Sequence, residues 1–220
     1  MSKIIKFGEE VKGYEIPVLN EREIRAAAGI FFVFAFTSVL LAVMKGNFVS
    51  LKYFIIIFLF DFIIRVFINP RFSPTLIIGR LIVIRQVPEY VGAAQKKFAW
   101  VIGLILALIM LALVVFVNSF SPITGLICLI CLIFLFFESA FGICLGCLFY
   151  GWFYGKKARY CPGEVCEVHD RHEIQKSSWV HWVIILGFIA FIILSVYFFN
   201  DTFKEQPRDL FQIMGSASSK

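Results

Sequence analysis

Five long apolar runs divide this chain, and the connectors between them carry most of its charged residues. A helix rises about 1.5 Å per residue, so roughly 20 apolar residues cross a hydrocarbon core of about 30 Å. The pattern therefore predicts five membrane-spanning helices, at residues 26–44, 53–68, 98–117, 123–141 and 179–200.

The first and third connectors have features of their own. Residues 1–25 form a short arm, in which Asn20 is placed to cap the first helix ahead of an acidic first turn. Residues 69–99 contain an apolar piece that is too short and too charged to span, which favours a helix in the membrane interface. We expect Arg80 and Arg85 of this piece to reach the lipid headgroups.

The predicted fold class is an all-α integral membrane protein. Its four-span core occupies residues 26–141, with the interfacial segment 69–99 inside it, and a fifth span follows at residues 179–200. Between them lies a cysteine-rich segment at 142–178, and residues 201–220 form a tail whose end has a flexible composition.

The composition supports this class. Hydrophobic residues make up 60% of the chain and charged residues only 16%, which is more apolar than a soluble domain can bury. The lipid bilayer is thus the first expected partner. The net charge of +6 does not indicate nucleic acid, because the basic residues flank apolar runs and form no block interleaved with aromatics.

The distribution of lysine and arginine predicts the orientation. With five spans, residues 1–25, 69–99 and 142–178 share one side of the membrane and carry fifteen of these residues, against five on the other side. Positive connectors stay on the cytoplasmic side. We therefore expect the N-terminus and the cysteine-rich segment to face the cytoplasm, where thiols are normally kept reduced.

Three charged residues lie inside the predicted spans. Asp61 and Arg65 are four residues apart and share a helix face, so they can form an ion pair that lowers the cost of either charge in lipid. The pair is either structural or lines a polar path or quinone-type pocket. Glu138, in the fourth span, needs a partner such as Arg65, or must take up a proton.

The cysteine-rich segment holds the candidate chemistry. It contains a C-x2-C pair and a C-x4-C pair thirteen residues further on, followed by two histidines. Two such pairs fit reversible disulfide or persulfide exchange, a four-thiolate metal site such as zinc with histidine as a substitute ligand, or unreactive thiols. The residues are Cys144, Cys147, Cys161, Cys166, His169 and His172.

The position of the first pair complicates the redox interpretation. Cys144 and Cys147 are expected on a turn at the end of the fourth span, and the dipole at a helix C-terminus disfavours a thiolate. Cys128 and Cys131 lie one turn apart towards the other end of that span. Core packing is the default for them, and a second thiol station across the membrane is the alternative.

The sequence FESAFGICLGCLFY at 137–150, with NPRFS at 69–73 and the four-span frame, resembles an uncharacterised group of bacterial membrane proteins. The proteins of this group share a domain of unknown function with C-x-G-C after the fourth helix. The resemblance covers roughly residues 20–155. It implies a bacterial inner-membrane location and a link to thiol and sulfur metabolism, but no established activity. A helix bundle ending in C-x-x-C is also similar to quinone-linked thiol oxidoreductases, which work on the opposite, oxidising side.

The sequence therefore favours an inner-membrane protein that exchanges disulfide or sulfur at its cytoplasmic face with a soluble thiol or sulfur-carrier protein. In this interpretation Cys144 and Cys147 react with the partner, and Cys161 and Cys166 resolve or relay. The alternative is a non-enzymatic subunit of a larger membrane complex, in which the cysteines hold zinc or are inert.

Overall fold

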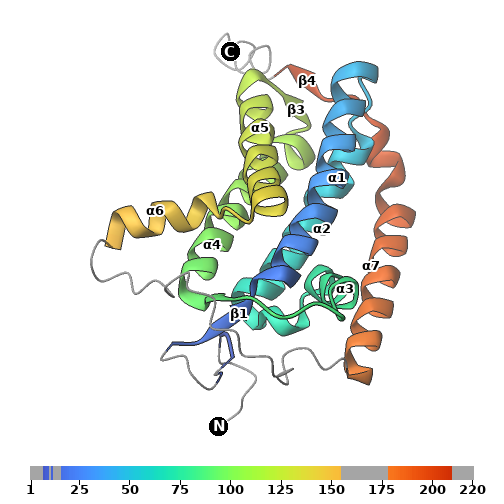
Figure 1. Ribbon diagram of the computed structural model, residues 1–220. Coiled ribbons are helices and arrows are strands. Elements are labelled where there is room, and N and C mark those ends of the chain that lie inside the picture. The colour runs from blue at the N-terminus through green and yellow to red at the C-terminus, as the bar shows by residue number, and fades with distance from the viewer. Residues whose placement is uncertain (1–6, 10, 12–15, 155–177, 210–220) are drawn as a thin grey trace.

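The computed structural model describes residues 7–9, 11, 16–154 and 178–209, and these are mainly helical (Figure 1). The helices are α1 (Glu21–Lys45), α2 (Val49–Ile63), α3 (Pro74–Ile82), α4 (Ala93–Met110), α5 (Pro122–Phe136), α6 (Leu145–Tyr154) and α7 (Trp179–Lys204). Three of them continue into π-helical turns, which are η1 (Ile64–Ile68) after α2, η3 (Leu111–Phe116) after α4 and η4 (Phe137–Phe141) after α5. A 3-10 turn, η2 (Pro70–Phe72), precedes α3.

Within the described residues, four helices are long and apolar enough to cross a membrane: Glu21–Lys45, Ala93–Phe116, Pro122–Phe141 and Trp179–Lys204. The protein thus has the architecture of a multi-pass membrane protein. The helix formed by α2 and η1 is not among the four, and it carries Lys52, Asp61 and Arg65. A total of five crossings therefore remains a prediction.

The first helix starts where its capping residue predicts. Asn20 is extended, and its side chain accepts a hydrogen bond from the backbone N–H of Arg22 at 3.2 Å. This cap lets α1 begin at Glu21, five residues before the apolar run. Similarly, α4 begins at Ala93, ahead of its expected start at residue 98.

The helices form a bundle with two small sheets at opposite ends (Figure 1). α1 packs against α2, α3 and α5, while α2 also packs against α4 and α7. β1 (Val18–Asn20) pairs antiparallel with β2 (Tyr90–Gly92) where α1 and α4 begin. β3 (Ser119–Phe120) pairs in parallel with β4 (Arg208–Asp209), just before α5 and after α7.

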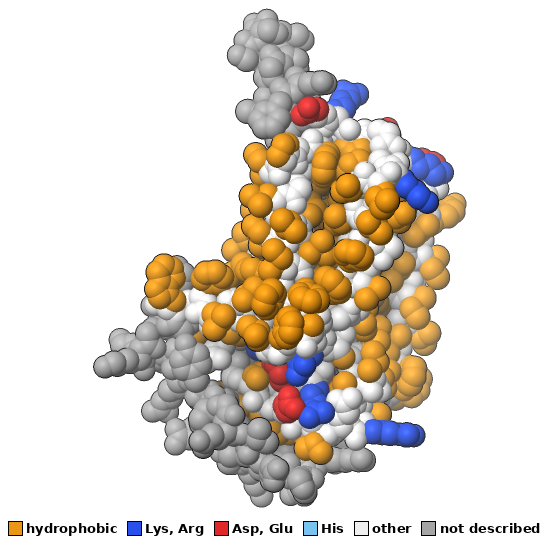
Figure 2. Space-filling view, turned by 45° about the horizontal axis from the view of Figure 1, so that its top comes forward, with side chains coloured by type: hydrophobic (Ala, Val, Ile, Leu, Met, Phe, Trp, Pro, Cys, Tyr) orange, Lys and Arg blue, Asp and Glu red, His pale blue; other side chains and the backbone are white. Residues whose placement is uncertain are grey.

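Aromatic side chains fill the centre of the bundle and apolar side chains also cover its outside. Phe31 of α1 makes edge contacts with Phe54 and Phe58 of α2, at ring-centre distances of 6.2 and 4.9 Å. Figure 2 shows hydrophobic side chains over most of the visible surface, with charged residues confined to the two ends. Such an apolar exterior suits contact with lipid.

The segment 69–99 contains α3, which packs against α1 and α7. Gly79 makes this approach possible, because a Cβ there would lie 2.6 Å from the Glu23 carbonyl oxygen. Arg80 is therefore brought onto Glu23 Oε2, at 3.2 Å from Nε and 3.1 Å from Nη2. The prediction that Arg80 reaches the lipid headgroups is wrong, because its guanidinium pairs with Glu23 inside the bundle. An interfacial position of the whole segment remains a prediction.

Candidate functional site

The cysteine pair lies at the start of a helix, not at the end of one. Gly142 adopts a left-handed conformation (φ 69°) and its N–H donates to the Glu138 carbonyl at 3.1 Å, which ends η4. Three residues later α6 begins. The Cys147 N–H donates to the Cys144 carbonyl at 3.0 Å and approaches Cys144 Sγ at 3.3 Å. The predicted turn at the end of the fourth span is present, but the left-handed Gly142 separates this span from the cysteines, so the predicted effect of a helix C-terminus on them is wrong.

This position changes the electrostatics of the pair. The structure joins Cys144 and Cys147 in a disulfide, with their Cα atoms 5.1 Å apart. Both residues are half-buried. The N-terminus of a helix carries partial positive charge and unpaired N–H groups, so it favours a thiolate on Cys144 whenever the disulfide is open.

Gly146, between the two cysteines, allows α6 to pack directly on α4. A Cβ at this position would lie 2.6 Å from the Cβ and 2.8 Å from the Cα of Ala99. Any larger residue would push the cysteine turn away from α4. The ring of Tyr150, one turn further along α6, contacts Phe98 of α4 at 5.5 Å. The glycine in C-x-G-C thus positions the disulfide against the bundle.

Glu138 belongs to a buried network of charges next to this turn. Lys96 Nζ lies 2.7 Å from Glu138 Oε1 and 2.8 Å from Glu21 Oε2, and the lysine side chain is only 3% exposed. Arg25 lies beside this network, where its Nη2 donates to the Ala140 carbonyl at 3.5 Å. The prediction that Arg65 is the partner of Glu138 is wrong, because Lys96 is its partner in the structure. Sequence reasoning missed Lys96 because the predicted third span starts at residue 98, whereas α4 starts at Ala93 and includes the lysine.

Asp61 and Arg65 form the ion pair that their spacing predicts. Arg65 Nε lies 2.6 Å from Asp61 Oδ2, with the two side chains 3% and 0% exposed. Asp61 Oδ1 also accepts from Ser73 Oγ at 2.8 Å and from the Thr75 N–H at 3.0 Å. The guanidinium lies over Trp100, at 5.3 Å from the ring centre. The pair therefore connects the end of α2 to the start of α3.

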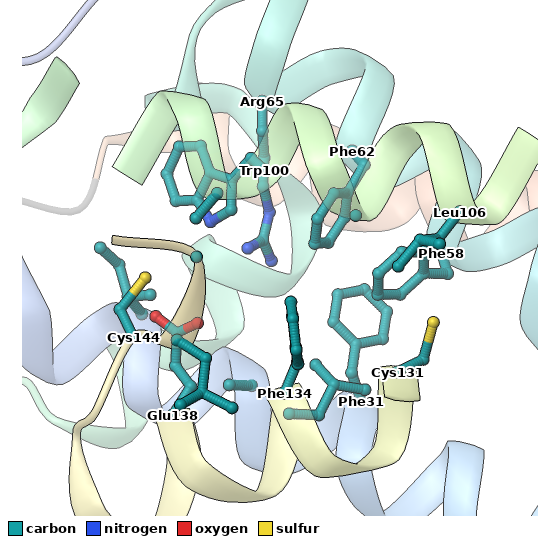
Figure 3. Close-up of a pocket in the computed structure, with 17 residues that line it drawn as sticks. Phe31, Phe58, Phe62, Arg65, Trp100, Leu106, Cys131, Phe134, Glu138 and Cys144 are labelled. Atoms are coloured by element: carbon teal, nitrogen blue, oxygen red, sulfur yellow. The ribbon is translucent and has the colours of Figure 1, made fainter. Parts of the chain in front are cut away.

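A cavity of about 60 Å³ brings these groups together (Figure 3). Arg65, Glu138, Cys131 and Cys144 all line it, among aromatic residues that include Trp100. In Figure 3, Cys144 and Glu138 lie at one end of the cavity and Cys131 at the other. A water molecule needs about 10–15 Å³ by the same measure, so the space holds a few waters or one very small molecule.

Cys128 and Cys131 lie deeper in the bundle. Both line a second, apolar cavity of about 30 Å³, and Cys131 lines the first cavity as well. Their sulfurs are free in the structure. Cys128 is buried, as core packing predicts, but Cys131 also faces the space that Cys144 faces.

The second half of the predicted site cannot be placed in the same way. Cys161, Cys166, His169 and His172 lie outside the described residues. Within the part of the chain that the structure describes, no three His, Cys, Asp or Glu side chains are grouped as metal ligands. The zinc interpretation depends on the four residues outside this part, so it remains an alternative.

Comparison with known proteins gives one result. Searches of curated proteins and of solved structures found no match. The family described as "Domain of unknown function (DUF4395)" matches residues 19–154, which run from β1 to the end of α6 and include Cys144 and Cys147. The chain therefore belongs to the DUF4395 family, and α7 lies outside the matched region.

Proposed function

We propose that this protein exchanges disulfides with a thiol partner through Cys144 and Cys147. The observation that carries the proposal is their arrangement: the two sulfurs are within bonding reach at the N-terminus of α6, and Cys144 lines a cavity with Glu138 and Arg65. Thiol exchange needs a thiolate and a nearby second thiol, and this geometry favours both.

The exchange proceeds in two steps. In the reduced protein the Cys144 thiolate attacks one sulfur of a partner disulfide, forming a mixed disulfide and releasing the partner's other sulfur as a thiolate. The Cys147 thiolate then attacks Cys144 Sγ, which closes the internal disulfide and releases the second partner thiolate. Two electrons pass from this protein to the partner, and the reverse sequence reduces the Cys144–Cys147 disulfide.

Glu138 is the carboxylate that lines the cavity with Cys144 in the described part of the chain. We assign it the exchange of the Cys144 proton, directly or through water in the cavity. Lys96 of α4 holds this carboxylate in place, and Glu21 of α1 in turn pairs with Lys96. Cys161 and Cys166 act in this proposal as the resolving or relay pair.

The proposed location is the bacterial inner membrane, with the cysteines on the cytoplasmic side. The excess of lysine and arginine in segments 1–25, 69–99 and 142–178 supports this orientation. A partner on this side is a soluble thiol protein or a sulfur carrier, since both supply sulfur nucleophiles in a reducing compartment.

Counting of free thiols in vesicles tests the proposal. We expect a maleimide mass tag to add at least two more labels to the wild-type protein after reduction than after mild oxidation. The Cys144→Ser variant should lose this redox-dependent pair, while Cys128→Ser should keep it. The proposal would be contradicted if Cys144, Cys147, Cys161 and Cys166 all stay reduced and unreactive under every condition. Zinc lost from the purified protein on Cys144→Ser would favour the structural alternative instead.

A further inference from the structure

α6 is a short helix with exposed apolar side chains on its outer side. It has ten residues, Leu145–Tyr154, and none of them is charged. At about 1.5 Å per residue it is roughly 15 Å long, which is half of what a crossing needs. Figure 1 shows that it projects sideways from the bundle, at a steep angle to α1 and α7.

The two sides of α6 have different partners. Gly146 and Tyr150, one turn apart, face α4 through Ala99 and Phe98. The other side carries Leu148, Phe149 and Trp152, which are 61%, 46% and 80% exposed. Since water does not favour so large an apolar stripe, another apolar phase must cover it.

The contact with α4 fixes the depth of α6. Ala99 lies six residues after the start of α4 at Ala93, which is about 9 Å along the helix axis. Interfacial helices lie with their apolar face about 5–10 Å into the boundary between headgroups and acyl chains. In Figure 2 the projecting apolar side chains of α6 are level with the lower part of the apolar surface, just above a group of charged side chains. The sequence after α6 continues with Lys156, Lys157 and Arg159, a composition suited to phosphate headgroups.

We propose that α6 is a membrane-interface helix that lies parallel to the bilayer surface and inserts Leu148, Phe149 and Trp152 among the lipids. The helix that carries Cys147 is then an interfacial helix of this protein. Lipid contact holds α6 from outside while Gly146 holds it against α4 from inside. This inference is independent of the proposed thiol chemistry.

Depth-dependent fluorescence quenching tests it. The protein with Trp179→Phe and Trp182→Phe keeps Trp152 and the buried Trp100, which is 3% exposed. It is placed in phosphatidylcholine vesicles that carry a doxyl quencher at acyl carbon 5 or carbon 12. We expect at least twofold stronger quenching by the carbon-5 label. The same protein with Trp152→Phe as well should show little quenching by either label.

Three results would overturn the proposal. Stronger quenching by the carbon-12 label would place α6 in the hydrocarbon core. Quenching of Trp152 by aqueous iodide, with no effect of either lipid label, would place it in water. Protection from all three quenchers would mean that protein, such as a second copy of this chain, covers the stripe.

Discussion

Replacement of Asp61 by asparagine tests how the charged residues within the bundle are tolerated. Asp61 is fully buried and accepts three hydrogen bonds, from Arg65, Ser73 and Thr75. Asparagine has nearly the same shape and retains one acceptor oxygen, so the variant removes mainly the negative charge. Arg65 is then a buried cation without a counter-ion.

The expected cost follows from these contacts. Breaking a buried ion pair by removing one partner destabilises a protein by about 3–5 kcal/mol. The asparagine oxygen can still accept from Ser73 and Thr75, and Arg65 keeps its contacts with Phe62 and Trp100 at 4.8 and 5.3 Å. We therefore expect the lower end, about 3 kcal/mol, which is roughly a hundredfold change in the unfolding equilibrium.

Unfolding in mixed micelles, followed by circular dichroism, measures this change. Asp201→Asn is the matched control, because it removes an aspartate from an ion pair with Lys204 whose side chains are 99% and 62% exposed. That variant should unfold like the wild type. Replacing both Asp61 and Arg65 by leucine should recover part of the lost stability, because no unpaired charge remains. The recovery should be incomplete, because the Thr75 N–H still lacks its acceptor. An unchanged midpoint for Asp61→Asn would refute the reasoning.

Three further predictions concern the cysteine turn and its orientation. Glu138→Gln should slow thiol exchange at least tenfold and alter the pH dependence of its rate. Glu21→Gln disturbs the same lysine, Lys96, and should change the stability of the protein more than this pH dependence. If the Glu138→Gln variant has the pH profile of the wild type, Glu138 takes no part in the reaction. Gly146→Ala should displace α6 and slow exchange, while Gly187→Ala, whose Cβ meets nothing within 4 Å, should not; equal rates would contradict the packing argument. A periplasm-active reporter should be silent when fused after residue 160 and active when fused after residue 205, and the opposite pattern would reverse the orientation.

The sequence was sufficient to predict the features that depend on local pattern. Apolar runs of spanning length located all four membrane-crossing candidates, and Asn20 correctly marked the start of α1. The spacing of Asp61 and Arg65 correctly predicted their pair, because residues four apart on a helix are neighbours.

The features that sequence reasoning missed depend on contacts between distant segments. Lys96 meets Glu138 across 42 positions, and Arg80 meets Glu23 across 57. No helical period links such residues, so their partners follow only from the packing of α1, α3, α4 and η4. The end of the fourth span at residue 141 was predicted correctly, but the apolar residues after Gly142 gave no sign that a second helix, α6, begins at Leu145.

The approach of Cys131 to the same cavity as Cys144 has a similar origin. On a single straight helix Cys131 and Cys144 would lie far apart, and the sequence alone predicts such a helix. In the structure the chain turns at Gly142, and α1, α2 and α4 complete a cavity that both residues line. The cavity is a property of the assembled bundle.

A redox titration of the Cys144–Cys147 pair tests the central claim most directly. The protein with the other four cysteines replaced by serine is equilibrated in vesicles with reduced and oxidised glutathione at a series of ratios, and free thiols are counted. The proposal predicts that both thiols disappear together, as a two-electron couple, within the range that glutathione buffers can set. Two thiols that remain free at every ratio, or that react independently with glutathione and never form the internal disulfide, would contradict it.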